Sequence, residues 1–156
     1  MTPADLQRIT DPKLLDNVIV NAIRHANEPL RLAALRRKVE ILGGDADDPL
    51  EVEMQRVIAA REEVLFMQHG RRLQANRLRK KHAGSGAQAT FEYLASNRDA
   101  TEGYDSLVDN GMIEFTAEHV VLRYPDRFSE KARTRAAERL AEVGVTVPPA
   151  GAQDQE

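Results

Sequence analysis

The chain has 156 residues, of which 42% are hydrophobic and 30% charged, and its formal net charge is −3. Aromatic residues make up only 4% and tryptophan is absent, so a folded core must be built mainly from Leu, Val, Ile and Ala. Because Ala, Leu, Arg and Glu are good helix formers, this composition favours helix over sheet. The absence of cysteine excludes disulfides, thiolate zinc sites and thiol catalysis.

The N-terminal sequence MTPADLQRITDPKLL has no long apolar run, so it is typical of neither a signal peptide nor a membrane anchor. No segment contains the roughly 20 consecutive apolar residues that a membrane-spanning helix needs. Together with the lack of cysteine, these features predict a cytoplasmic protein with no membrane partner.

Four helix starts in the N-terminal half are marked by proline beside a capping residue. Thr2 and Asp11 each precede a proline, Pro29 lies near a third start, and Asp48 is followed by proline and then by an acid at the third position. Proline suits the first turn because that turn cannot satisfy its amide hydrogens, and the acid complements the helix dipole. These signals predict helices that begin near residues 3, 12, 28 and 49.

Apolar residues recur at helical spacing after these starts and define three stripes. The stripes are Leu15, Val18, Ile19, Ala22 and Ala26; Leu32, Leu35, Val39 and Leu42; and Leu50, Met54, Val57, Ile58 and Leu65. Gly43 and Gly44 end the second of these helices. The pattern predicts an N-terminal three-helix unit over residues 1–68, with its helices nearly antiparallel because the connections are short.

The C-terminal half also has helical punctuation. One helix is predicted with Phe91 inward, a short one ends at Asn110-Gly111, and a last one is capped by Ser129 and ends at Gly144. We predict a smaller helical unit over residues 87–144 and a disordered tail over 145–156. The fold class is therefore predicted to be all-α.

Residues 112–124 fit two structures. One is a capped helix from Thr116 to Arg123 that stops before Pro125, and the other is a β-hairpin that pairs 112–115 with 119–124, because β-branched and aromatic residues cluster there. The helix is favoured. A hairpin would be consistent with a winged-helix DNA-binding domain, but the helix before it carries three acidic residues and no cation, which counts against phosphate contact there.

A basic connector is predicted over residues 69–86. No Asp or Glu occurs between Val64 and Phe91, whereas six cations lie in that window. The rest of the sequence therefore contains 16 basic and all 25 acidic residues. Leu73 and Leu78 share no apolar stripe, and a helical wheel of the segment places its cations on all sides. The sequence GSG at 84–86 is typical of a joint between two elements.

A run of cations without acids is suited to phosphate contact, because the neutralised phosphates release counterions. We therefore predict a nucleic-acid-associated accessory or regulatory protein, with DNA preferred to RNA as partner. The predicted contact residues are Arg71, Arg72, Asn76, Arg77, Arg79, Lys80 and Lys81.

Two alternatives remain open for this segment. It can be a solvated helix end balanced by the acidic body, for example against Asp45, Asp47 and Asp48. It can also order on an acidic surface of another protein, which would make the chain a non-catalytic interaction subunit such as an adaptor, an inhibitor or a structural component.

Motifs for catalysis and metal binding were not found. The four histidines lack zinc-ligand spacing, the glycine pairs lack a phosphate-loop context, and the serines lack a nucleophile elbow. The acidic loop at 45–48 has no closing glutamate for a calcium site, because the chain enters a helix at Pro49. We therefore expect no catalytic residue, no metal and no cofactor. A protein that is not an enzyme is favoured, and an enzymatic function stays open as a third hypothesis below the other two.

Overall fold

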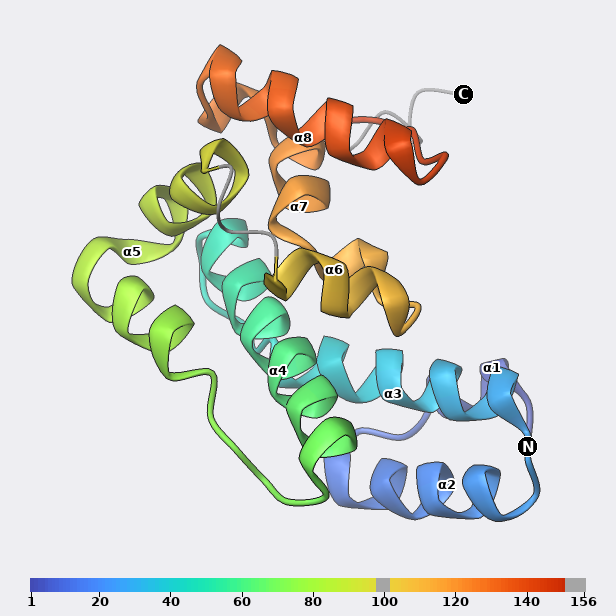
Figure 1. Cartoon of the computed structure of the whole chain (residues 1–156). Helices are drawn as coiled ribbons and strands as arrows, with labels where there is room; N and C mark the ends of the chain where they lie inside the picture. Colours follow the sequence, from blue (N-terminus) through green and yellow to red (C-terminus); the bar gives the residue numbers. More distant parts are fainter. Residues whose placement is uncertain (98–101, 151–156) are drawn as a thin grey trace.

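The computed structural model describes residues 1–97 and 102–150, and all its regular elements are helical, so the predicted all-α class is confirmed (Figure 1). Within these ranges no residue forms a strand. The α-helices are α1 (Pro3–Leu6), α2 (Pro12–Arg24), α3 (Glu28–Leu42), α4 (Pro49–His69), α5 (Asn76–Ser96), α6 (Glu102–Asp109), α7 (Ala117–Arg123) and α8 (Glu130–Glu142), with two 3-10 turns, η1 (Ile113–Phe115) and η2 (Pro125–Arg127).

The predicted helix starts are confirmed by capping hydrogen bonds. The Asp11 carboxylate accepts the Lys13 amide at 2.9 Å, and the Asp48 carboxylate accepts the Leu50 amide at 3.0 Å. Thr2 forms a capping box with the aspartate at the third helical position of α1. These contacts span two or three residues, so the sequence pattern is sufficient to define them.

Residues 112–124 form the turn η1 followed by α7, which confirms the helix interpretation and leaves the hairpin without support. Thr116 caps α7, because its hydroxyl accepts the His119 amide at 3.2 Å. Val120 and Val121 are both fully buried, although they are adjacent and would face opposite sides of a strand. Without strands here, the winged-helix alternative has no wing.

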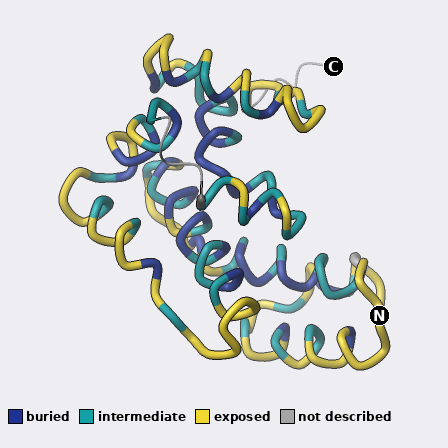
Figure 2. The backbone as a smooth tube through the Cα atoms, viewed as in Figure 1, coloured by how far each residue is buried: buried dark blue, intermediate teal, exposed yellow. Residues whose placement is uncertain are grey.

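Helix α4 runs through the centre of the molecule and contacts α3, α5, α6 and α7. Figure 2 shows buried positions concentrated on α4 and α7, while much of α2 and the first half of α5 is exposed. Phe91 of α5 packs edge-on against Phe128, with ring centroids 6.4 Å apart. Most of the predicted stripe residues are buried or half-buried, but Leu42 is exposed and Ala26 lies beyond the end of α2.

Helix α4 ends at Gly70, which has a left-handed backbone conformation with φ 71°. Residues 71–75 are not helical, and α5 then begins at Asn76. Helix α5 bends at Gly86, where φ is 84° and ψ is 171°, within the joint that the sequence predicted. The bend separates a first half (76–85) from a second half (87–96), and the two run in different directions (Figure 1).

Substitution of Gly86 by alanine should lower the free energy of unfolding by about 1–3 kcal/mol, because this φ/ψ region is accessible essentially to glycine alone. A Cβ at Gly86 meets no heavy atom within 4 Å, so the cost is conformational and not a clash. Gly84→Ala is the matched control: that position is equally open and helical, and alanine there should stabilise the protein by up to about 1 kcal/mol. Urea unfolding would measure both, and equal effects would contradict the strain at Gly86.

The predicted disordered tail is described only as far as residue 150. Residues 145–150 form no helix, and the Ala150 amide donates to the Arg123 carbonyl oxygen at 2.7 Å. The rest of that tail, 151–156, lies outside the described residues. In the described part of the chain, no helix is both long and apolar enough to cross a bilayer.

Candidate nucleic-acid interface

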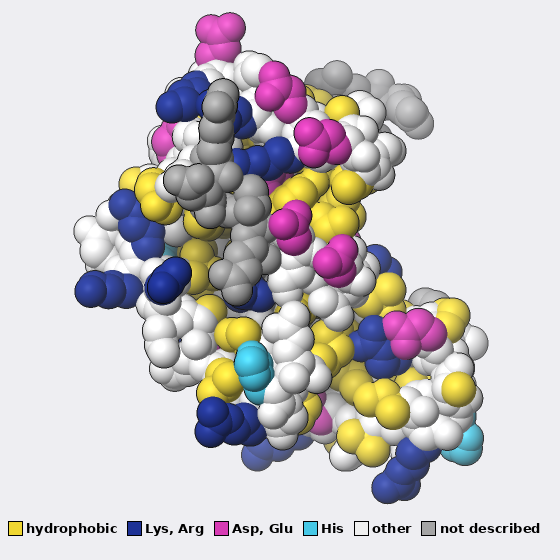
Figure 3. Space-filling model, in the orientation of Figure 1, with side chains coloured by type: hydrophobic (Ala, Val, Ile, Leu, Met, Phe, Trp, Pro, Cys, Tyr) yellow, Lys and Arg dark blue, Asp and Glu magenta, His cyan; other side chains and the backbone are white. Residues whose placement is uncertain are grey.

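The seven predicted contact residues occupy the 71–75 loop and the first half of α5, which the structure places along one side of α4. Figure 3 shows basic side chains gathered over this part of the molecule, at the left edge of the view. The structure divides the six cations into two groups. One group is ion-paired with acids of the body, and the other has no acidic partner.

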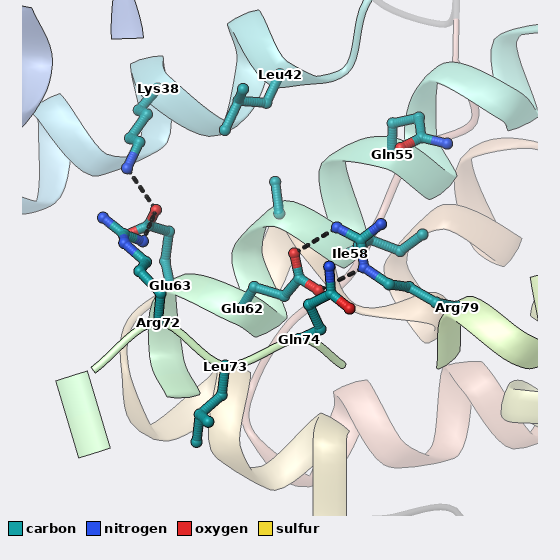
Figure 4. Close-up of a pocket in the computed structure, with 11 residues that line it drawn as sticks. Lys38, Leu42, Gln55, Ile58, Glu62, Glu63, Arg72, Leu73, Gln74 and Arg79 are labelled. Atoms are coloured by element: carbon teal, nitrogen blue, oxygen red, sulfur yellow. Dashed lines mark hydrogen bonds and ion pairs between the residues drawn. The ribbon is translucent and has the colours of Figure 1, made fainter. Parts of the chain in front are cut away.

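Arg72 belongs to the paired group. Its guanidinium donates to the Glu63 carboxylate at 2.6 Å and lies 4.1 Å from the centroid of the Phe66 ring. The same Glu63 oxygen accepts from the ammonium of Lys38, a buried side chain that also pairs with Asp16 at 2.8 Å (Figure 4). Arg72 therefore ties the 71–75 loop to α4.

Arg79 is the second paired cation. Its Nε and Nη2 donate to the two oxygens of Glu62, both at 2.6 Å, and Glu62 also accepts the Ala75 amide at 2.8 Å (Figure 4). Burial alone would raise the pKa of Glu62, but the hydrogen bonds from Arg79 and Ala75 hold this pKa below its ordinary value. Arg79 therefore fixes the start of α5 on α4, and two of its three guanidinium nitrogens are already paired.

The remaining cations have no acidic partner within the described ranges. Arg71, Arg77 and Lys80 are exposed, and Lys81 places its ammonium 4.8 Å from the centroid of the Tyr93 ring. Because α5 starts at Asn76, Arg77, Lys80 and Lys81 stand three and four residues apart on one helix face. The helical wheel placed cations on all sides because it extended helical geometry through residues 71–75, which are not helical.

This cationic face lines a groove of about 1000 Å³, which is large enough for a sizeable ligand. The other walls come from α4, the second half of α5, α6 and the start of α7. Asn76, the uncharged member of the predicted set, also lines it. The apolar lining residues include Val57, Leu65, Leu78, Leu94 and Leu107. The structure therefore brings four of the seven predicted residues together at one groove. Arg71 stays in the loop, and Arg72 and Arg79 are paired with acids of α4.

Two polar side chains that were not among the residues predicted from the sequence, Glu118 and Arg61, also line this groove. Glu118 is 1% exposed; its Oε1 accepts from Arg139 at 3.4 Å, while its Oε2 has no hydrogen-bond partner. Burial raises the pKa of Glu118 to about 7, although Arg139 opposes the shift. Arg61 Nη1 is likewise buried without a partner. Buried polar atoms seldom lack partners, so both retain hydrogen-bonding capacity.

A signal for Glu118 was present in the sequence. Once α7 is recognised as a helix, Ala117, Val120 and Val121 define its buried face, and Glu118 falls among them, three residues before Val121. A carboxyl group on such a face is buried by the fold, and buried ionisable groups are frequent at functional sites.

The predicted alternative of docking on the acidic loop differs from the structure. Asp48 pairs with Arg127 at 3.0 Å instead, while the basic segment is held by Asp16, Glu62 and Glu63. Among the residues that the structure describes, no three His, Asp or Glu side chains are grouped as metal ligands. The chain matches no protein-family model, no curated protein and no solved structure.

Proposed function

We propose that this protein binds the phosphate backbone of a nucleic acid through the face of α5 that carries Arg77, Lys80 and Lys81. The observation that supports the proposal is that these cations share one face and no acid of the described chain neutralises them. Cations placed in this way release phosphate counterions on binding, which supplies most of the affinity of nonspecific complexes. Its role is that of an accessory or regulatory protein. We place it in the cytoplasm because a chain without cysteine forms no disulfides and fits a reducing compartment.

Arg72 and Arg79 have a positioning role in this proposal. They hold the loop and the start of α5 on α4, and thereby orient the face that binds. Arg71 adds a cation at the edge of the site. We expect DNA in preference to RNA and a modest sequence preference, because Asn76 is the one amide of the predicted set that can reach a base edge.

Combined replacement of Arg77, Lys80 and Lys81 by alanine should reduce nucleic-acid affinity by about ten- to a hundredfold at low salt. The slope of log affinity against log salt concentration should become shallower by up to about 3, because each lost phosphate contact removes about one released counterion. Fluorescence anisotropy with a labelled oligonucleotide at several salt concentrations measures both quantities.

The matched control replaces Arg8, Lys13 and Arg24 by alanine, which removes the same charge from exposed positions on and beside α1 and α2. Its affinity should stay within about twofold of wild type, because these cations lie outside the groove. If both triple variants weaken binding equally, net charge and not the α5 face governs affinity, and the proposal is wrong.

An acidic protein surface is the alternative partner. The basic segment would face the acids of such a partner. Exposed apolar side chains on α2 favour a protein partner: Leu14, Val20 and Ile23 are 51%, 48% and 61% exposed. Native mass spectrometry of the protein isolated from its own cells distinguishes the two. Co-purifying nucleic acid supports the proposed function, and a stoichiometric protein partner supports the alternative.

A further inference from the structure

The basic face of α5 lines a concave surface. Its cations line a groove whose other walls are α4, the second half of α5 and α6, so a ligand that contacts all three cations lies along this groove. A recognition helix for duplex DNA must enter a major groove about 12 Å wide, which requires a protruding element. A flexible single strand has no such requirement, because it can follow a groove in the protein.

The bend at Gly86 adds an aromatic ring to the same surface. It turns the second half of α5 so that Tyr93 lies against Lys81 of the first half, with 4.8 Å between the ammonium and the ring centroid. Tyr93 lines the groove and is 47% exposed. A cationic groove with an accessible aromatic ring is the combination that binds unpaired strands, since every base has a face that can stack.

Two polar atoms of the groove wall lack hydrogen-bond partners, which also bears on the form of nucleic acid that binds. Glu118 Oε2 is a buried carboxyl oxygen and Arg61 Nη1 a buried donor, and neither has a hydrogen bond. An unpaired base carries free donors and acceptors on its pairing edge, whereas a base in a duplex has already satisfied that edge. Both atoms are fully buried in this structure, so a base can contact them only when the side chains of the wall move apart.

We infer that the groove binds single-stranded nucleic acid, with phosphates along Arg77, Lys80 and Lys81 and a base stacked on Tyr93. The inference depends on the proposed function, because it specifies which form of nucleic acid the α5 face takes. It adds Tyr93 as a contact residue that acts on unpaired bases. The duplex is then the weaker ligand, bound only through its phosphates.

The test compares anisotropy titrations of a labelled oligothymidylate of about ten nucleotides with those of a duplex of equal length, both at about 50 mM salt. We expect the single strand to bind at least about tenfold more tightly. Tyr93→Leu, which keeps the bulk and removes the ring, should weaken single-strand binding about tenfold and leave the duplex unchanged, whereas Tyr93→Phe should bind like wild type.

The control variant is Phe66→Leu. Phe66 is also an exposed ring beneath a cation, with Arg72 at 4.1 Å, but it lies outside the groove. Its single-strand affinity should equal that of wild type. Circular dichroism confirms that each variant is folded, which we expect because Tyr93 is half-exposed.

The outcomes separate the two proposals. Equal affinity for strand and duplex, or no loss in Tyr93→Leu, overturns the single-strand inference; the proposed function still stands if the α5 triple variant loses affinity. Absence of salt-dependent binding to either ligand overturns both.

Discussion

Replacement of Glu63 by alanine is expected to lower the free energy of unfolding by about 2–3 kcal/mol, the cost of losing hydrogen bonds between charged groups. The Glu63 carboxylate accepts from the buried ammonium of Lys38 and from Arg72, so its removal leaves Lys38 with Asp16 as the acidic group nearest to it. Lys38 is only 5% exposed, and Asp16 remains as its acidic partner. A buried charge that loses one of two partners costs more than an exposed charge does, because water cannot replace the lost contact. Urea unfolding followed by circular dichroism at neutral pH measures the change.

Two further variants make this result specific. The double variant Lys38→Met with Glu63→Leu should recover most of the loss, because it replaces the whole buried pair by apolar side chains of similar size. Glu28→Ala removes a carboxylate that is 67% exposed and pairs with Arg31, and should cost no more than about 1 kcal/mol. A Glu63→Ala variant as stable as Glu28→Ala would show that the Lys38–Glu63 pair contributes little.

This buried cluster connects the stability of the fold to the candidate interface. Glu62 and Glu63 are adjacent on α4, yet each holds a different cation of the basic segment, Arg79 and Arg72. Together they fix the 71–75 loop and the first turn of α5. The orientation of the cationic face of α5 toward the groove therefore depends on two carboxylates that need not touch a ligand themselves.

The parts of the fold that could be predicted from the sequence are those set by neighbouring residues. Asp48, Thr116 and Ser129 cap their helices through bonds to amides two or three residues ahead, and these contacts need no knowledge of the tertiary structure. The choice of helix over hairpin at 112–124 was correct for the same reason: Thr116 is a local helix start and Pro125 a local end.

The division of the basic segment could not be predicted in this way. Whether Arg79 contacts a ligand or the body depends on Glu62, 17 residues earlier, and on α5 starting at Asn76. That start follows no capping side chain, since Ala75 makes no side-chain hydrogen bond there. The helix phase is consequently set by tertiary contacts, and with it the face on which Arg77, Lys80 and Lys81 meet.

The buried carboxyl group of Glu118 leads to the second large expected effect, a pH-dependent stability. Its pKa in the folded protein is about 7, against an ordinary value of 4.5, mainly because burial disfavours the charged form. The charged and titratable groups around it are Arg139 on α8, which opposes the shift, Asp105 and Tyr104 on α6, and Arg61 on the same groove wall. Between about pH 4.5 and 7 the folded protein therefore holds a proton that the unfolded chain has released.

A raised folded-state pKa contributes stability that is fully present below pH 4.5 and is lost as pH rises through about 7. The loss amounts to on the order of 3 kcal/mol. Glu118→Gln removes this titration, so at pH 8 the variant should be the more stable protein, and its advantage should shrink as pH falls toward 4.5. The prediction concerns the difference in unfolding free energy between wild type and Glu118→Gln. Glu62, Glu92 and other carboxylates with lowered pKa values make the stability of both proteins rise with pH, and the difference removes this shared effect.

Urea unfolding of wild type and Glu118→Gln at about pH 4.5, 6 and 8 measures this difference. Glu138→Gln, which removes an exposed negative charge from α8, controls for the change in net charge. A Glu118→Gln advantage that is the same at all three pH values would mean that the carboxyl group does not titrate across this range in the folded protein. An advantage that grows with pH, and that disappears when a single strand occupies the groove, would place the same carboxyl group in contact with the ligand.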